Sequence, residues 1–383
     1  MKESFLRAAA WLSLSLLMAL SLSSAAMSAD GECDLSAATI YQTASPAVVF
    51  ISATTINPYR VADRVEHIVG SGFIIDGEGL ALTNSHVVFG RQSLAVRLSD
   101  GATLPARLLG ADPIFDIAVL QIPKPKDGKL PVLALGDSNG VRVGEDVLAL
   151  GNPLGLDQSL TRGIISAVNR ILPATFFSLQ EPLIQVDTPI NHGNSGGPLL
   201  NRCGEVIGIT TAIISDAQNI GLVIPINLAK ASLPELLKDG HLARPWLGFH
   251  GQFIDRDLKR LLRLPLTTGF LIEAVEPGSP AEQAQLQGGD LELTIAGNDF
   301  LLGGDIITSM NGKRLDSPES VISALQELKV GSELSLTIFR EGKSQEVKYK
   351  LSERPLLPGD IPGQADAALA PGRQAGETAR IKF

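Results

Sequence analysis

The sequence has few cysteines, few charged residues and no long run of basic residues. Two cysteines and five histidines occur in 383 residues, without a CxxC, HExxH or comparable ligand spacing, so neither a metal site nor a cofactor is expected. The 41 acidic residues outnumber the 32 basic ones. Nucleic acid is therefore not an expected partner, because phosphate binding needs a concentrated basic surface. With 19% charged and 44% apolar residues, the composition excludes a largely disordered chain.

Helical periodicity is almost absent from the first two thirds of the chain. Between Pro46 and Pro225 we count twelve short runs rich in Val, Ile and Leu, separated by Gly, Asp and Asn. One of these runs, over residues 103–110, is expected to be a single strand. Runs of this length bounded by turn residues are typical of strands, and two sets of six predict two small β-barrels.

The remaining third of the chain contains helical patterns as well as strand patterns. A helix is predicted over Asn227–Lys238 and is ended by Gly240. A second domain with strands and two short helices follows at residues 242–353. Residues 354–383 are rich in Pro, Gly and Ala and have few large apolar residues, so a flexible tail is expected.

The N-terminus has the pattern of a secretory signal. Lys2 and Arg7 precede an apolar stretch over residues 8–22, and small residues follow it. This pattern predicts a signal peptide over residues 1–28. An uncleaved membrane anchor is the alternative, because residues 8–27 are nearly long enough to span a bilayer. Both readings predict export.

Export changes the reading of the two cysteines. Cys33 lies just after the signal segment, and Cys203 lies in a predicted hairpin turn. In an exported protein an even number of cysteines favours a disulfide, which predicts a Cys33–Cys203 bond. Two free buried thiols are the alternative.

The segment most informative about chemistry is DTPINHGNSGGPLL at residues 187–200. A serine hydroxyl becomes a nucleophile only when a base takes its proton, and glycines beside Ser195 let a substrate approach closely. His86 in LTNSHVV could be that base, and Asp116 in FDIAVL could orient it. Taken singly, His86 could be a core histidine and Ser195 a turn serine. The three motifs together favour catalysis.

A GxSxG nucleophile elbow is the competing interpretation of GNSGG. That motif needs a helix directly after the serine, and it needs the acid and the histidine later in the chain. Here a predicted hairpin follows Ser195, and both His86 and Asp116 precede it. The elbow is therefore rejected.

The ordered motifs TNSHVV, DIAVL and GNSGGPL resemble the chymotrypsin-like serine proteases. GNPLGL at 151–156, TRGIIS at 161–166 and the second domain narrow the resemblance to the HtrA/Deg family of exported proteases with PDZ domains. The resemblance implies a mostly β protein, with a double six-stranded barrel over residues 38–230 and an α+β PDZ domain over residues 242–353.

By this resemblance the catalytic residues are His86, Asp116 and Ser195, and the oxyanion hole is formed by Gly193, Asn194 and Ser195. The specificity pocket would be lined by Pro189, Ile190, Thr210 and Thr211. No acidic residue occurs between Thr188 and Gly193, so we expect small or medium aliphatic side chains on the acyl side of the cut. A shift of two residues in the alignment to the family would instead place Asp187 in the pocket.

The resemblance also assigns a peptide site to the second domain. The amides of the WLGF loop would bind a peptide C-terminus, and the peptide would add as a strand. Helical positions 321, 325 and 328 could form the groove wall or belong to the core. The implied peptide-site residues are Trp246, Leu247, Gly248, Phe249, Val321 and Leu325. The duplicated Gly-Asp turns at 288–290 and 303–305 predict an inserted hairpin that turns at Gly297-Asn298.

The expected function is an exported, ATP-independent serine endopeptidase that acts on unfolded or mislocalised proteins. Its expected partners are such substrates and peptide C-termini at the PDZ domain, and the family implies a homotrimer in the bacterial periplasm. The alternative is a PDZ-dependent chaperone or adaptor with weak or latent proteolysis.

Overall fold

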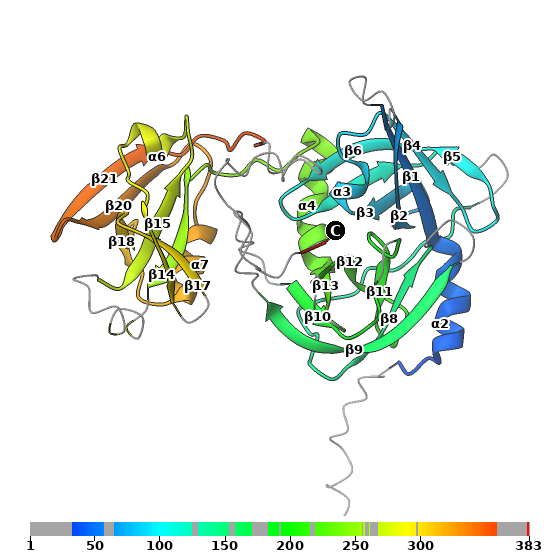
Figure 1. The fold of residues 1–383 in the computed structure, drawn as a ribbon. Helices are drawn as coiled ribbons and strands as arrows, with labels where there is room; N and C mark the ends of the chain where they lie inside the picture. Colours follow the sequence, from blue (N-terminus) through cyan, green and yellow to red (C-terminus); the bar gives the residue numbers. More distant parts are fainter. Residues whose placement is uncertain are drawn as a thin grey trace, which may run out of the picture.

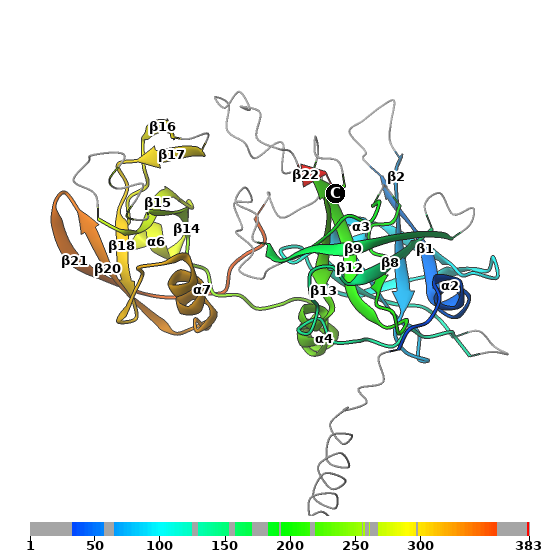
Figure 2. The same cartoon turned by 90° about the horizontal axis from the view of Figure 1, so that it is seen from below.

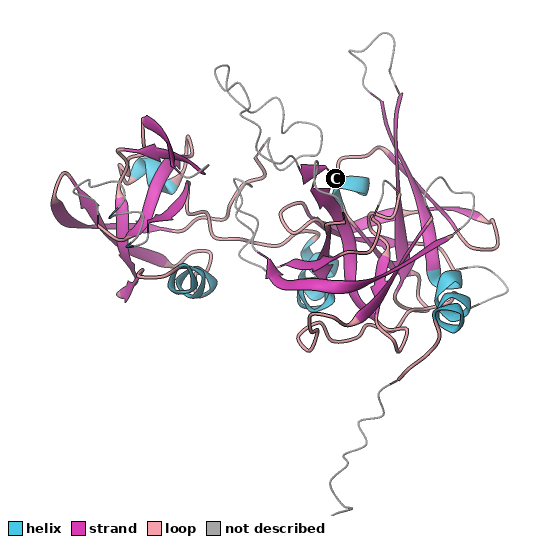
Figure 3. Cartoon of the chain, turned by 60° about the horizontal axis from the view of Figure 1, so that its bottom comes forward, coloured by secondary structure: helices cyan, strands magenta, loops and turns pink. Residues whose placement is uncertain are grey.

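The protein is described here from a computed structural model. The structure describes residues 33–56, 65–124, 129–152, 158–170, 183–190, 193–214, 219–254, 256, 260, 267–295, 298–357 and 381–382. The expected signal segment lies outside these ranges. Within them, no helix combines the length and the apolar character needed to cross a membrane. Figures 1 and 3 show two lobes built mainly from strands and joined by the segment after α4 (Ile226–Asp239).

The first sheet contains seven strands in the order β5-β4-β1-β2-β3-β7-β6. Their bounds are β1 (Val48–Ile56), β2 (Val65–Ile74), β3 (Leu80–Thr83), β4 (Ser93–Arg97), β5 (Thr103–Pro105), β6 (Arg107–Asp112) and β7 (Ile117–Gln121). The single strand expected over residues 103–110 is wrong, because β5 ends at Pro105, whose nitrogen carries no hydrogen for a ladder. Only Ala106 separates β5 from β6, which lie at opposite ends of the sheet order, so the sheet curls until its ends meet.

The second sheet closes into a barrel. Its strands are β8 (Asp146–Gly151), β9 (Ser159–Arg170), β10 (Leu183–Val186), β11 (Pro198–Leu200), β12 (Val206–Ile214) and β13 (Gly221–Pro225). They follow the order β11-β8-β9-β10-β13-β12, and a further β11–β12 pairing closes the ring of six. The expected double barrel is therefore confirmed, with seven strands rather than six in the first sheet because residues 103–110 form both β5 and part of β6.

One short strand departs from the expected flexible tail. β22 (Ile381–Lys382) pairs antiparallel with β12, with Ile213 opposite Lys382 and Ile214 opposite Ile381. In Figure 2 this short strand lies beside β12. The tail prediction is thus wrong for these two residues.

The apolar core has three clusters around the two barrels. One cluster fills the first barrel and includes Val49 and Ile74, and another fills the second and includes Val147 and Ile165. A third cluster combines residues of both sheets, such as Phe73 and Leu150, with residues of the flanking helices. Shared burial of this kind holds the two barrels together and fixes the surfaces that face each other between them.

Two helices flank the barrels. α4 agrees with the helix predicted over Asn227–Lys238, and Gly240 caps it with a φ of 78°. α2 (Ala37–Ala44) has no counterpart among the predicted elements. It begins at Ser36, whose side chain accepts the Thr39 N–H, and it buries Ile40 and Ala44. Its eight residues supply only two buried apolar positions, which is too weak a pattern to recognise in the sequence.

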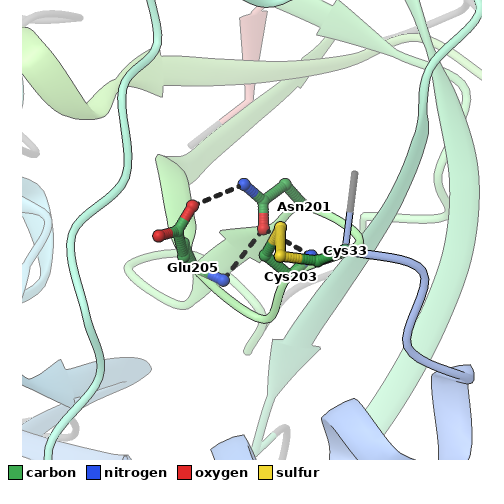
Figure 4. Close-up of a disulfide and its surroundings, with 4 residues drawn as sticks. All are labelled: Cys33, Asn201, Cys203 and Glu205. Atoms are coloured by element: carbon green, nitrogen blue, oxygen red, sulfur yellow. Dashed lines mark hydrogen bonds between the residues drawn. A yellow bond between two sulfur atoms is a disulfide. The ribbon is translucent and has the colours of Figure 1, made fainter. Parts of the chain in front are cut away.

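A disulfide fixes the chain just before α2. Cys33 and Cys203 are joined, with their Cα atoms 4.9 Å apart, well within the range for such a bond. Figure 4 shows that Asn201 organises the turn, because its Oδ1 accepts the N–H groups of Cys203 and Glu205. An ion pair between Arg202 and Asp34 lies beside the bond. The N-terminal segment is therefore tied to the second barrel.

Replacing both cysteines by serine is expected to lower the free energy of unfolding by about 2–4 kcal/mol, because the bond closes a loop across a separation of 170 residues. Denaturant unfolding with and without a thiol reductant measures the effect. The reductant should destabilise the natural chain and leave the double variant unchanged. Equal stability of the two oxidised proteins would contradict the prediction.

The second lobe is built around a six-stranded sheet with the main order β14-β15-β18-β20-β21, and β19 pairs with β18. Its elements are β14 (Phe249–Ile254), β15 (Gly269–Val275), α6 (Pro280–Gln283), β18 (Ile306–Met310), β19 (Lys313–Arg314), α7 (Pro318–Gln326), β20 (Glu333–Arg340) and β21 (Lys343–Lys350). β14 is an edge strand of this sheet.

The inserted hairpin is also present. β16 (Leu291–Ile295) pairs with β17 (Asn298–Leu302) as a separate two-stranded sheet. Asn298 is opposite Ile295 and belongs to the strand, so it is not part of the turn as expected. Gly297, the other predicted turn residue, lies outside the described residues.

Candidate active site

His86 lies in α3 (Ser85–Val88), a single helical turn directly after β3. Its Nδ1 is 2.8 Å from Asp116 Oδ2 and 3.0 Å from Oδ1, and its backbone N–H donates to Oδ1 at 2.9 Å. Both side chains are mostly buried, with exposed fractions of 16% and 13%. One carboxylate thus fixes both the ring and the backbone of His86.

Asp116 ends the turn before β7 and has left-handed backbone geometry, with a φ of 56°. Aspartate tolerates this conformation better than most residues. Its carbonyl accepts a hydrogen bond from Asn84 Nδ2 at 2.9 Å, and its Oδ2 accepts one from Thr211 Oγ1 at 2.6 Å. These bonds hold the carboxylate in place under the imidazole.

The same turn is also held by the segment that leads to the second lobe. Both terminal nitrogens of the Arg244 guanidinium, Nη1 and Nη2, donate to the fully buried Asp112 carboxylate at 2.5 Å. The guanidinium also lies 4.2 Å from the centre of the Phe115 ring. Asp112 ends β6 directly before the turn that carries Asp116, and Phe115 lies within that turn, so Arg244 connects the interdomain segment to it.

Ser195 lies in the turn before β11. Its Oγ donates to the Thr211 carbonyl oxygen at 3.1 Å. The turn needs glycine at position 196, where φ is 85° and a Cβ would lie 2.2 Å from the Ser71 carbonyl oxygen. The GNSGG pattern thus reflects both backbone angle and close packing.

Thr211 links Asp116 to Ser195, because its hydroxyl donates to the Asp116 carboxylate and its carbonyl accepts the Ser195 hydroxyl. It lies where the β12–β13 register shifts between Thr210 and Ala212. Such a bulge redirects one residue out of the regular alternation. The sequence predicts Thr211 in the specificity pocket, because the residues carry no sign of the bulge.

Comparison with known proteins agrees with this geometry. Residues 70–209 match the model of a trypsin-like peptidase domain, and residues 247–351 match that of a PDZ domain. The chain is 33% identical to the solved HtrA-type protease AlgW with a tripeptide, covering 85% of this chain and 99% of that one with a TM-score of 0.65. The solved serine endoprotease from Yersinia pestis is 30% identical, with 84% and 98% covered and a TM-score of 0.62.

The chain belongs to the HtrA family of serine endoproteases. Among curated relatives, a probable periplasmic serine endoprotease DegP-like from Pseudomonas putida is 38% identical over 309 residues, covering 80% of this chain and 60% of that protein. One from Brucella suis is 36% identical over 289 residues, covering 75% and 53%. The chain therefore spans between half and three fifths of the length of these relatives.

In this HtrA protein, buried hydroxyl groups hold the segment over residues 193–195, which the sequence predicts to form the oxyanion hole. Ser71 Oγ donates to the Gly193 carbonyl oxygen at 2.6 Å, and Thr210 Oγ1 donates to that of Asn194 at 2.6 Å. Asn194 is only 3% exposed. The Thr210 hydroxyl, expected in the specificity pocket, therefore binds the backbone of the turn that carries Ser195.

The remaining pocket candidates lie between β10 and β11. Ile190 is 6% exposed and packs against Gly221, where a Cβ would lie 2.6 Å from Ile190 Cδ1. Pro189 is exposed, and its carbonyl accepts the Thr161 hydroxyl at 3.2 Å. Asp187, the alternative, directs Oδ1 to the backbone N–H of Ile164 at 2.6 Å. Its carboxylate is thus already engaged by β9.

The WLGF loop opens the edge strand β14. The Leu247 carbonyl accepts the Tyr349 hydroxyl at 2.9 Å, and the Gly248 carbonyl accepts the Glu276 N–H at 2.8 Å. Burial raises the pKa of Tyr349, so its hydroxyl keeps the proton that it donates. Because C=O and N–H point in opposite directions across a trans peptide, the amides of Gly248 and Phe249 face away from these partners. They point to the side of the loop where the sequence predicts that a peptide carboxylate binds.

The buried carboxylate of Glu276 is hydrogen-bonded to the WLGF loop. Burial alone would raise the pKa of Glu276, but hydrogen bonds from His250 and Trp246 lower it. The ionised carboxylate accepts a hydrogen bond from Trp246 Nε1, and His250 Nε2 lies 2.7 Å from it.

The predicted groove residues of α7 pack against the edge strand. Val321, Leu325 and Phe249 share one apolar cluster. The two helix residues are therefore at least partly core residues, as the sequence allowed.

Proposed function

We propose that this chain is an exported serine endopeptidase that cleaves unfolded or mislocalised proteins with His86, Asp116 and Ser195. The observation that carries the proposal is the 2.8 Å contact between His86 Nδ1 and the Asp116 carboxylate, with Thr211 joining that carboxylate to Ser195. Such a carboxylate leaves Nε2 of His86 to act as the base.

In the proposed reaction, Ser195 Oγ attacks the substrate carbonyl while His86 Nε2 takes its proton. The oxyanion of the tetrahedral intermediate is stabilised by the amides of Gly193 and Ser195. His86 then protonates the leaving amine, and water repeats the cycle on the acyl-enzyme. Asp116 fixes the imidazole tautomer and stabilises the imidazolium.

The test is digestion of a permanently unfolded protein such as casein without ATP, beside a tightly folded protein. The natural chain should degrade the first and spare the second, and a Ser195→Ala variant should degrade neither. Suppression of aggregation without any cleavage by the natural chain would favour the chaperone alternative.

We also propose that the chain is a homotrimer in the periplasm. Analytical ultracentrifugation would test the trimeric state.

We expect cleavage mainly after small or medium aliphatic residues such as Val and Ala. Ile190 is apolar and buried, and the bond from the Ile164 N–H holds the Asp187 carboxylate at the backbone of β9, so we do not expect this carboxylate to pair with a Lys ammonium in the pocket. Mass spectrometry of casein fragments measures the preference, with Asp187→Asn as a control that should not change it. A majority of cuts after Lys or Arg would overturn the apolar pocket.

The proposed partner of the PDZ domain is a peptide C-terminus. Gly248→Ala is expected to weaken binding of a labelled C-terminal peptide about tenfold or more, because a Cβ there would lie 2.4 Å from Ser279 Cβ and the φ of 79° is left-handed. Gly278→Ala is the matched control, since its φ is 76° but a Cβ would meet nothing within 4 Å. Equal affinity of both variants, or of a C-terminally amidated peptide, would contradict this site.

A further inference from the structure

Ser71 is a fully buried residue of β2 in the first barrel. It contacts the turn over residues 193–196, which carries Ser195 and is called the nucleophile turn below. Its backbone N–H donates to the Ser195 carbonyl at 2.8 Å, and its Oγ donates to the Gly193 carbonyl at 2.6 Å. Two carbonyl groups on either side of Asn194 are thus held by one residue.

The Ser71 hydroxyl has its own position fixed. It accepts the N–H of Asn152 at 2.8 Å, at the end of β8 in the second barrel, while it donates to Gly193. The Ser71 carbonyl accepts the Thr83 hydroxyl at 2.7 Å. With one bond donated and one accepted, the hydroxyl hydrogen is directed to Gly193, and the residue joins both barrels to the turn.

These bonds fix successive peptide planes of the turn. The Gly193 and Ser195 carbonyls point to Ser71, and the intervening Asn194 carbonyl points to the Thr210 hydroxyl at 2.6 Å. Because each peptide is planar and trans, a fixed Asn194 carbonyl fixes the opposite direction of the Ser195 N–H. That N–H is one of the two proposed oxyanion donors.

We propose that Ser71 is a positioning residue for the oxyanion hole. Its hydroxyl holds the Gly193 carbonyl and its N–H holds the Ser195 carbonyl, so Ser71 fixes the peptide planes on both sides of the plane that carries the Ser195 N–H. It thereby keeps the turn in the shape that aims this N–H at the developing oxyanion. Gly193 has a φ of 103° and no side chain to restrain it, so its peptide plane depends on outside partners. This inference rests on the proposed function.

Ser71→Ala removes the partner of both the Gly193 carbonyl and the Asn152 N–H. We expect kcat for a small peptide substrate to fall about 10- to 100-fold while KM stays within about twofold, because the donor matters mainly in the transition state. Affinity for a peptide boronate, whose adduct is tetrahedral, should fall by the same factor as kcat/KM. If Ser71 had only a structural role, Ser71→Ala would bind the boronate as tightly as the natural chain, and kcat would not fall while KM stayed constant.

Thr83→Val is the matched control, because it removes another buried hydroxyl that binds the carbonyl of Ser71 rather than those of the turn. It should lower the melting temperature and leave kcat within about threefold, a loss well below the roughly 100-fold or more that acid–base groups or oxyanion donors supply. If Ser71→Ala does not fold, Ser71→Cys keeps a weak donor of similar shape and should show an intermediate loss of kcat.

An unchanged kcat in Ser71→Ala, or equal losses of kcat in Ser71→Ala and Thr83→Val, would overturn the inference. Failure of the proposed function would look different. In that case the natural chain itself would neither cleave the peptide nor bind the boronate, and it would behave like Ser195→Ala.

Discussion

Ser195→Ala is expected to lower kcat for peptide hydrolysis by about 10⁵- to 10⁶-fold, because it removes the proposed nucleophile. The melting temperature should change little. The hydroxyl makes one hydrogen bond with a described partner, the Thr211 carbonyl, and such a bond contributes about 1 kcal/mol net. Cleavage of a fluorogenic peptide and thermal unfolding, measured on the same preparations, test both parts.

Ser85→Ala provides a control from the same site. Ser85 is a buried serine next to His86, and its Oγ has no hydrogen-bond partner among the described residues. Losing that hydroxyl should leave kcat within a few-fold of the natural chain, a small change against the factors that catalytic groups supply. Comparable turnover by Ser195→Ala and the natural chain would exclude Ser195 as the nucleophile. Equal inactivity of Ser85→Ala would show that the assay reports damage to α3 rather than chemistry.

Much of the architecture follows from patterns of two to ten residues. The strands of both barrels were predictable because each is a short Val-, Ile- and Leu-rich run between turn residues, as in β7 and β8. Helix α4 ends at Gly240 for the local reason that glycine accepts a left-handed φ. His86, Asp116 and Ser195 could be named because each lies in a distinctive motif.

The features that were not predictable depend on contacts between distant segments. Thr211 turns toward Asp116 because of a bulge, which depends on how β12 pairs with β13. The role of Ser71 requires β2, β8 and the nucleophile turn to meet, across sequence separations of 81 and 122 residues. β22 pairs with a strand far from it in the sequence, and its two residues carry no strand pattern of their own.

Asp116→Asn is expected to lower kcat by about 10⁴-fold while the protein remains folded. Asparagine has nearly the same shape and also accepts the left-handed φ of 56°, so the turn and its bond from Asn84 should persist. The chemistry changes because an amide NH₂ directed at His86 Nδ1 is a donor. It favours the tautomer with the proton on Nε2, and that nitrogen can no longer accept the Ser195 proton.

Thr211→Val tests how the Asp116 carboxylate is held in place without removing its charge. It removes the 2.6 Å hydrogen bond to Oδ2 but leaves the carboxylate and its contacts to the ring and the backbone N–H of His86, so a loss of about tenfold is expected, typical of one supporting hydrogen bond. Steady-state kinetics of both variants on the same peptide, beside their melting temperatures, measure the difference. A kcat of Asp116→Asn within tenfold of the natural chain would show that His86 keeps its working tautomer without the carboxylate, and the proposed role of Asp116 would be lost.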